Sequence, residues 1–233
     1  MLDFLKRIFQ WRGRPPVSGA LIVEAGTIEK QVREAVAAID RVHTDGTLPL
    51  LPVKSAVLQD MYGYFLNTTG GRVVEIIVGL RNPHVELTMV HEVGHFLDFK
   101  GLDPSTEWAS VNSPTLAPWR EAVKTSRAVQ TLGQLSSPAT RTTAVTLWDG
   151  SVVEYPVNKS YVGYLLQAEE LWARSYSQFI ATQSRDPALL RQLGQEQERP
   201  VSGIYYPKQW GDADFQPIRA EMQTIFRGLR WMQ

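Results

Sequence analysis

The chain has 233 residues, 43% of them hydrophobic, which is enough for one domain with a substantial core. Its 24 basic and 24 acidic side chains give a formal net charge of zero, and this balance argues against broad binding of nucleic acid. The absence of cysteine excludes disulfides and thiolate ligands, so any metal must be held by His, Asp or Glu.

The first segment, residues 1–16, is basic and amphipathic. Residues 1–14 carry four basic side chains and one acidic side chain, and their apolar residues fall near one helical face. Lys6 and Arg7 interrupt the apolar run and no small-residue cleavage site follows, so we reject a signal peptide. The sequence has no apolar run of about 18 residues, so it predicts no membrane span. We expect a cytoplasmic protein. We interpret the segment as a short helix docked on its own domain or on a partner subunit, with weak association with a membrane surface as the alternative.

The half of the chain that follows, residues 17–101, predicts a small sheet with helices. Apolar or β-branched runs indicate strands, and apolar residues three or four apart indicate helices. The predictions in chain order are a strand at 20–23, a helix at 27–43, an irregular or edge strand at 48–57, a strand at 62–66, a turn at 67–71, a strand at 72–80 and a helix at 82–101.

Residues 102–233 predict a mostly helical second half with one hairpin around Asp149-Gly150, a strong turn signal. The fold class is therefore α+β. The predictions are a surface segment at 102–117, a helix at 118–132, a linker at 136–141, a hairpin at 144–157, a long helix at 161–183, a shorter helix at 186–195, an aromatic loop at 199–213 and a final helix at 215–232. We expect the loops at 102–117 and 199–213 to frame a cleft.

The helix predicted at 82–101 has recognisable end signals. Asn82 is a good N-cap, and Pro83 fits the first helical position, where its missing N–H costs nothing. Lys100 falls in the last turn, and Gly101 is predicted as the C-cap glycine.

This helix contains an H-E-x-x-H motif. His91 and His95 are four residues apart, so they share one helical face and can direct two imidazoles at one zinc ion. Glu92 projects beside them, where it can accept a proton from a water that the ion has made acidic. Gly94 leaves room for another segment to pass closely. The alternative is a solvated helical face, but the surroundings are apolar, and two of the four histidines fall in the motif.

The order of helix, strands and motif helix resembles the N-terminal half of the zincin metallopeptidases, in which a small twisted sheet precedes the H-E-x-x-H helix. The resemblance implies that the edge strand lines the cleft and pairs with extended substrate, and this strand would lie within residues 62–80. A catalytic zinc site usually has three protein ligands. The zincin class that takes its third ligand six residues after the second His is excluded, because Asp98 and Gly101 replace the Gly and His of its motif.

The stretch AEELWARSY, residues 168–176, resembles the later helix of the gluzincins, especially the lethal-factor-like group and similar domains of phages and mobile elements. The resemblance covers residues 72–100 and 161–180. It implies that Glu170 is the third metal ligand, and Glu169 is the competing choice.

The same resemblance suggests further roles. Arg174 stands where the thermolysin-like branch has Asp, so that branch is disfavoured and Asp98 becomes a candidate partner for a ligand histidine. Tyr164 resembles the tyrosine that stabilises the oxyanion in this family, and Tyr161 is the alternative. Either tyrosine could instead be a core aromatic. His84 lies two turns from the motif and is expected to be a helix-start residue rather than a ligand.

These observations predict a zinc-dependent peptidase. Residues 17–233 would form a zincin-like metallopeptidase domain, with a sheet-bearing half at 17–101 and a helical half at 102–233. Zn²⁺ would be held by the two motif histidines and Glu170, Glu92 would act as general base, and a peptide or protein would be the substrate. The alternative is a non-catalytic binding or assembly module with a structural zinc, as in phage-associated relatives of this fold. The resemblance also suggests a phage or prophage origin.

Overall fold

The computed structural model describes residues 15–44 and 48–232. The amphipathic segment predicted at 1–14 lies outside these residues, and its docking or surface association stays a prediction. Within the described part, no helix is both long and apolar enough to cross a membrane.

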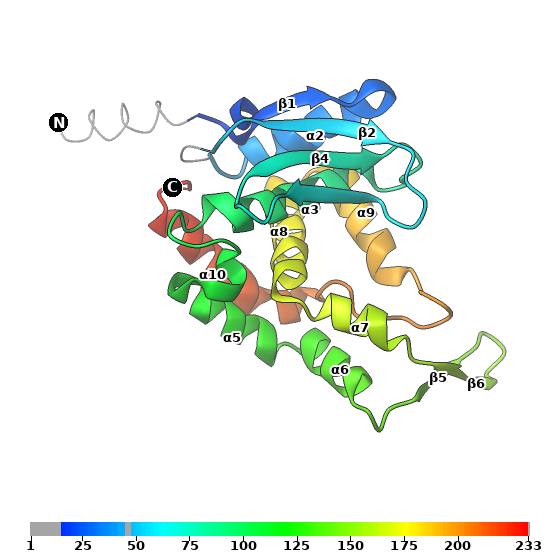
Figure 1. Ribbon diagram of the computed structural model, residues 1–233. Helices are drawn as coiled ribbons and strands as arrows, with labels where there is room; N and C mark the ends of the chain where they lie inside the picture. The colour runs from blue at the N-terminus through cyan, green and yellow to red at the C-terminus, as the bar shows by residue number, and fades with distance from the viewer. Residues whose placement is uncertain (1–14, 45–47, 233) are drawn as a thin grey trace.

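The described residues form a mixed four-stranded sheet with the strand order β1-β2-β4-β3 (Figure 1). β1 pairs in parallel with β2 and β2 with β4, whereas β3 runs antiparallel to β4 at one edge. One of the two edge strands, β3, therefore lies within residues 62–80, as the resemblance implied for the strand that lines the cleft. The four strands are β1 Leu21–Glu24, β2 Leu51–Ala56, β3 Gly63–Asn67 and β4 Val73–Gly79.

Helices make up most of the second half of the chain, together with the hairpin β5–β6 (Figure 1). This arrangement confirms the α+β class. The helices are α2 Glu29–Asp40, α3 Val85–Phe96, α4 Ala109–Asn112, α5 Ala117–Thr125, α6 Arg127–Ser136, α7 Lys159–Leu165, α8 Ala168–Ser184, α9 Pro187–Glu198 and α10 Asp212–Gly228; the hairpin strands are β5 Thr142–Thr146 and β6 Val152–Pro156; and 3-10 turns lie at Val17–Ala20, Gly26–Ile28 and Pro114–Leu116.

One face of the sheet is buried under helices, and the other carries polar and apolar side chains. Alternation along β2 explains this, because Leu51 and Val53 are fully buried while Lys54 points outward and pairs with Glu75 at 2.8 Å. α2 and α3 pack against each other, and α3 also contacts β3 and β4.

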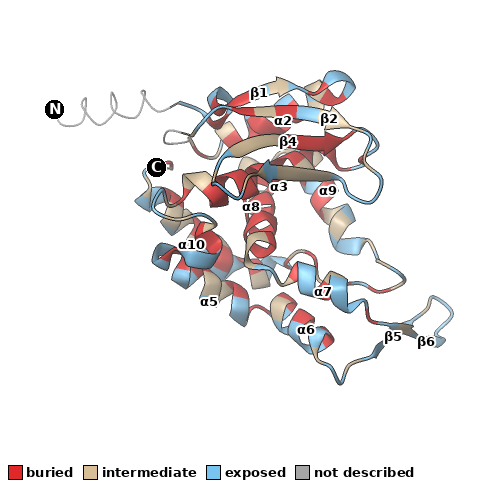
Figure 2. Cartoon of the chain, viewed as in Figure 1, coloured by how far each residue is buried: buried red, intermediate tan, exposed pale blue. Residues whose placement is uncertain are grey.

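Among the described helices, α3 and α8 form the most extensive contact, and most of α8 is buried (Figure 2). Their close approach depends on Gly94, because a Cβ atom at this position would lie 3.0 Å from Cα of Ala173. The indole N–H of Trp172 donates to the carbonyl of Gly94 at 3.2 Å. The expectation that Gly94 admits a neighbouring segment is confirmed.

Two helices that the sequence predicts as continuous are each broken into two. The helix predicted at 118–132 is divided at Ser126, whose extended backbone and side chain cap α6. The helix predicted at 161–183 is divided at Gln167, between α7 and α8. The buried guanidinium of Arg174 donates to the carbonyl of Leu165 and so satisfies the end of α7.

The motif helix also differs from its predicted ends. α3 begins at Val85, and the Asn82 side chain accepts from the His84 N–H at 2.8 Å in the turn before it. Beyond Phe96 the chain continues as a π-helical segment over Leu97–Gly101. The predicted C-cap role of Gly101 is wrong, because it lies inside this segment and does not have a positive φ. It is needed because a Cβ atom would lie 3.0 Å from the Trp231 ring.

The predicted hairpin is present, but its loop is longer than two residues. The Leu147 N–H donates to the Ser151 carbonyl at 2.8 Å, which leaves three residues in the loop, and Gly150 adopts a φ of 81°. Trp148 at the tip is 98% exposed.

Candidate metal centre

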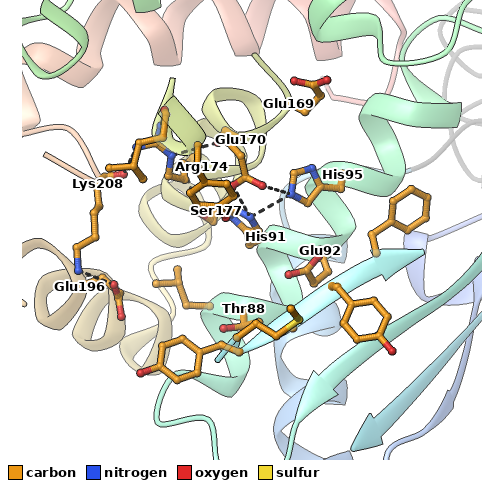
Figure 3. Close-up of a pocket in the computed structure, with 18 of the residues that line it drawn as sticks. Thr88, His91, Glu92, His95, Glu169, Glu170, Arg174, Ser177, Glu196 and Lys208 are labelled. Atoms are coloured by element: carbon orange, nitrogen blue, oxygen red, sulfur yellow. Dashed lines mark hydrogen bonds and ion pairs between the residues drawn. The ribbon is translucent and has the colours of Figure 1, made fainter. Parts of the chain in front are cut away.

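Three side chains from two distant elements converge in the structure. α3 supplies His91 and His95, one turn apart, and the first turn of α8 supplies Glu170 (Figure 3). The two Nε2 atoms are 3.1 Å apart, and the Glu170 carboxylate oxygens lie 3.4 Å from Nε2 of His91 and 3.3 Å from Nε2 of His95. Each imidazole nitrogen therefore lies within 3.4 Å of the other nitrogen and of one of the two carboxylate oxygens, and we call these three groups the triangle.

The triangle has the size that a tetrahedral ion requires. Bonds of about 2.0–2.1 Å to nitrogen and oxygen place adjacent ligand atoms of a tetrahedral zinc roughly 3.3 Å apart. The two imidazole nitrogens, 3.1 Å apart, are close enough either to share one hydrogen bond or to bind one cation. The set of two nitrogens and one carboxylate oxygen is typical of zinc. The described residues thus fit a metal, and His91, His95 and Glu170 would hold it.

The electrostatics favour the ligand form of the carboxylate. Burial by itself would raise the pKa of Glu170, but the hydrogen bonds and charges of His91 and His95 outweigh it and hold that pKa far below its usual range. Glu170 is therefore ionised at neutral pH. The pKa of His95 is raised, because Glu170 more than offsets the lowering by burial.

Glu92 lies beside the triangle and against the edge strand (Figure 3). Burial raises the pKa of its carboxyl, while His91 and His95 lower it. A Cβ atom at Gly63 of β3 would lie 3.1 Å from Oε1 of Glu92 and 2.7 Å from Cγ2 of Thr88. The sheet edge can pass this close because position 63 has no side chain.

A cavity of about 930 Å³ opens in front of these residues. Both predicted framing loops contribute to its wall, 102–117 through Trp108 and 199–213 through Arg199 and Lys208. The remaining wall comes mainly from β3, α3, α7 and α8.

The two candidate tyrosines lie on α7, apart from the helix of Glu170, and both line the cavity. Burial raises the pKa of the Tyr164 hydroxyl, and the adjacent Glu170 carboxylate raises it further. Burial also raises the pKa of the Tyr161 hydroxyl, but the charges that act on it are those of Arg174, Glu196 and Arg199 and not that of Glu170. Of the two tyrosines, Tyr164 therefore lies beside the triangle.

Glu169, the competing ligand, points away from the triangle (Figure 3). It lies next to Glu170 on α8, so its side chain leaves the helix on a different face. The structure therefore brings Glu170, and not Glu169, to the two histidines.

Asp98 does not hold a ligand histidine. Its carboxylate accepts from the backbone N–H and the hydroxyl of Ser110, both at 2.6 Å, and within the described part of the chain Nδ1 of His95 has no hydrogen-bond partner. Burial raises the pKa of Asp98 to about 7, although the Ser110 hydrogen bonds oppose this. Asp98 instead fixes the loop that carries Trp108, whose ring meets His95 edge-on with centroids 6.0 Å apart.

Sequence reasoning missed Trp108. It adopts a φ of 52°, which is uncommon for a residue with a large side chain, and its ring packs against Phe65 and Phe99 as well as His95. The only signal was a tryptophan in a segment rich in Ser, Pro and Thr. His84 lies at the start of α3 as expected, but its ring also contacts Glu196 of α9, which the sequence did not indicate.

Comparison of the chain with models of known families, with curated proteins and with solved structures gives no match. The functional argument therefore depends on the geometry described above.

Proposed function

We propose that the protein is a zinc-dependent peptidase of the gluzincin type, with Zn²⁺ held by His91, His95 and Glu170. The observation that carries this proposal is the approach of two imidazole nitrogens and a carboxylate group, with 3.1 Å between the nitrogens and 3.3 to 3.4 Å from each nitrogen to one carboxylate oxygen, in the wall of a cavity beside Glu92. Two imidazoles from α3 and one carboxylate from α8 make up the ligand set of a zinc site with three protein ligands.

The chain supplies the groups that peptide hydrolysis needs. When bound, Zn²⁺ would polarise the peptide carbonyl and make water more acidic. Glu92 accepts the proton of the attacking water and passes it to the leaving amine; burial, which raises its carboxyl pKa, suits it to both transfers. The hydroxyl of Tyr164 donates to the carbonyl oxygen as negative charge develops there.

An extended peptide or protein segment is the proposed substrate. Among the described strands β3 pairs on one side only, so its other edge offers free backbone groups beside the cavity. A peptide that adds to this edge would be held by main-chain hydrogen bonds, largely independently of its sequence. The close approach of Gly63 to Glu92 places that edge next to the proposed base.

The number of ligands argues against a purely structural zinc. Structural zinc sites normally have four protein ligands and are closed, whereas catalytic sites have three and keep one position open. Within the described residues the candidate group has three members and faces a cavity. A non-catalytic binding or assembly module is therefore the second candidate function. The following experiment distinguishes it from the peptidase.

The test is Glu92→Gln in the full chain, with zinc content measured by elemental analysis and cleavage by a broad peptide library. We expect zinc to be retained and turnover to fall by about 10²- to 10⁴-fold, because the proton acceptor is lost. Glu169→Gln is the matched control and should change neither quantity. Unchanged hydrolysis in Glu92→Gln would refute the proposed base, and a zinc-loaded parent that cleaves no peptide would support the binding module.

A further inference from the structure

A second group of charged side chains lies in the same cavity. It consists of His84, Glu196, Arg199 and Lys208, which we call the Glu196 cluster. The Glu196 carboxylate lies 2.8 Å from Nζ of Lys208, 3.3 Å from the Arg199 guanidinium and 3.2 Å from Nε2 of His84. Figure 3 shows Glu196 and Lys208 on the side of His91 that is opposite to His95.

The cluster has one more positive charge than negative. Burial lowers the pKa of His84, and Arg199 and Lys208 add to this lowering against the opposing effect of Glu196, so the ring is neutral at pH 7. Arg199 and Lys208 then share a single carboxylate. The Glu86 carboxylate accepts from Gln192 and raises the pKa of His84, but among the described residues it forms no ion pair with Arg199 or Lys208.

The cations retain unused hydrogen-bond donors. The Lys208 side chain is only 6% exposed, and of its three N–H bonds one has a partner among the described residues, namely Glu196. Nε of Arg199 is likewise buried and without a partner in this part of the chain. Behind them, the buried Arg174 donates to the backbone carbonyls of Glu170, Leu165 and Lys208, and within residues 15–44 and 48–232 no carboxylate lies within hydrogen-bonding distance of its guanidinium.

The excess positive charge is partly withdrawn from water, with the Lys208 side chain 6% exposed and the Arg199 side chain 36% exposed, and such a charge favours an anion beside it. We propose that the Glu196 cluster binds a carboxylate group of the peptide substrate. This carboxylate belongs either to an Asp or Glu side chain or to the C-terminus of the peptide. One excess positive charge matches one carboxylate, and Arg199 and Lys208 both have donors to offer it. This inference rests on the proposed function, since it names the class of peptide that the site takes.

The position of the cluster fixes where the carboxylate lies in the substrate. His84 and His91 are seven residues apart at the start and middle of α3, and a rise of 1.5 Å per residue separates them by roughly 10 Å. An extended peptide covers that distance with about three residues at 3.3 Å each. The recognised carboxylate therefore belongs to a residue two or three positions from the cleaved bond.

Binding to zinc-loaded, full-length Glu92→Gln tests this inference without turnover. The probes are fluorescent Ala-rich peptides in two matched series, one with a single Asp or Asn at successive internal positions and one with a free or amidated C-terminus. We expect the acidic member of one series to bind about tenfold or more tightly than its neutral partner. The series that shows the difference identifies the source of the carboxylate.

Three double variants, each with Glu92→Gln and one substitution in the cluster, test whether the preference for acidic peptides comes from the cluster. Lys208→Met and Arg199→Gln should bring the ratio between acidic and neutral peptides close to one, whereas Glu196→Gln should increase it, because a competing carboxylate is lost. A merely structural cluster would not strengthen anion binding in this way. Lys124→Met, at an exposed position of α5, is the control that should leave the ratio unchanged. Arg199→Gln decides the matter if Lys208→Met does not fold, because the Arg199 side chain is more exposed.

The outcomes separate this inference from the proposed function. Equal binding of acidic and neutral peptides, or no binding at millimolar concentration, by folded and zinc-loaded protein would overturn the carboxylate site whether or not the parent cleaves peptides. A clear preference for acidic peptides in a chain whose parent cleaves none of them would keep the site and overturn the peptidase.

Discussion

His43 is a histidine far from the candidate site that is held neutral by its surroundings. Its Nδ1 donates to the carbonyl of Thr44 at 2.8 Å, so its Nε2 must accept the hydroxyl proton of Tyr176, also at 2.8 Å. The ring stacks on Phe226 with centroids 4.6 Å apart. Burial lowers the pKa of His43 from 6.5 to about 4, although the hydrogen bond to the Thr44 carbonyl opposes this.

Because His43 is neutral in the folded protein, we expect the free energy of unfolding to fall in mild acid. Between pH 6.5 and about 4 the unfolded chain binds a proton at His43 and the folded chain does not, so the free energy of unfolding falls as pH falls through this window. The full difference corresponds to roughly 3 kcal/mol. Urea unfolding of metal-free protein at pH 7 and pH 4.5 should show this loss, and His43→Gln should reduce it. An identical loss in His43→Gln would contradict the assignment.

At the scale of elements, the pair α3 and α8 shows what the sequence could and could not predict. Helical spacing alone placed His91, Glu92 and His95 on one helix, and the glycine within the motif indicated a close neighbour. The neighbour itself was known only by resemblance, because Glu170 is separated by many residues and by several elements. The break before α8 was missed because Arg174, which satisfies the end of α7, reads locally as an ordinary helical residue.

Gly94→Ala should disturb both folding and metal binding, because the new Cβ atom would lie 3.0 Å from Cα of Ala173 and 3.1 Å from Cδ1 of Tyr176. α8 must move away, which costs about 1–3 kcal/mol of stability and carries Glu170 away from the histidines. Urea unfolding and zinc titration would measure the two effects. Gly194→Ala, in α9, is the matched control, since no atom lies within 4 Å of its Cβ position and stability should rise by up to about 1 kcal/mol. Zinc affinity equal to the parent in Gly94→Ala would show that the helix contact does not set the ligand geometry.

At the scale of the whole molecule, the order of strands and helices followed from local patterns, while the second charged group did not. The β-branched runs and turn signals predicted the sheet and the hairpin because they act over a few residues. The Glu196 cluster draws on residues at 84, 196, 199 and 208, and nothing within any one of these segments signals the others. Such a group emerges only when the loop after α9 folds back against the start of α3.

The proposed metal joins the two halves of the chain, so its binding should stabilise the whole fold against unfolding. His91 and His95 come from the sheet-bearing half and Glu170 from the helical half, and the unfolded chain does not present them together. Zinc at one hundred times its Kd should stabilise the fold by about 2.7 kcal/mol. For a domain of this size that corresponds to a rise in Tm of roughly 5–10 °C.

Differential scanning fluorimetry after chelation, with and without added Zn²⁺, measures this rise. Mg²⁺ should give little or none, because it prefers oxygen ligands in octahedral geometry. His91→Asn removes one imidazole from the triangle and should abolish most of the zinc response, whereas His84→Asn, which leaves the triangle intact, should keep it. If His91→Asn shows the same zinc response as the parent, the ion binds elsewhere. His91, His95 and Glu170 would then not be the site that links the two halves.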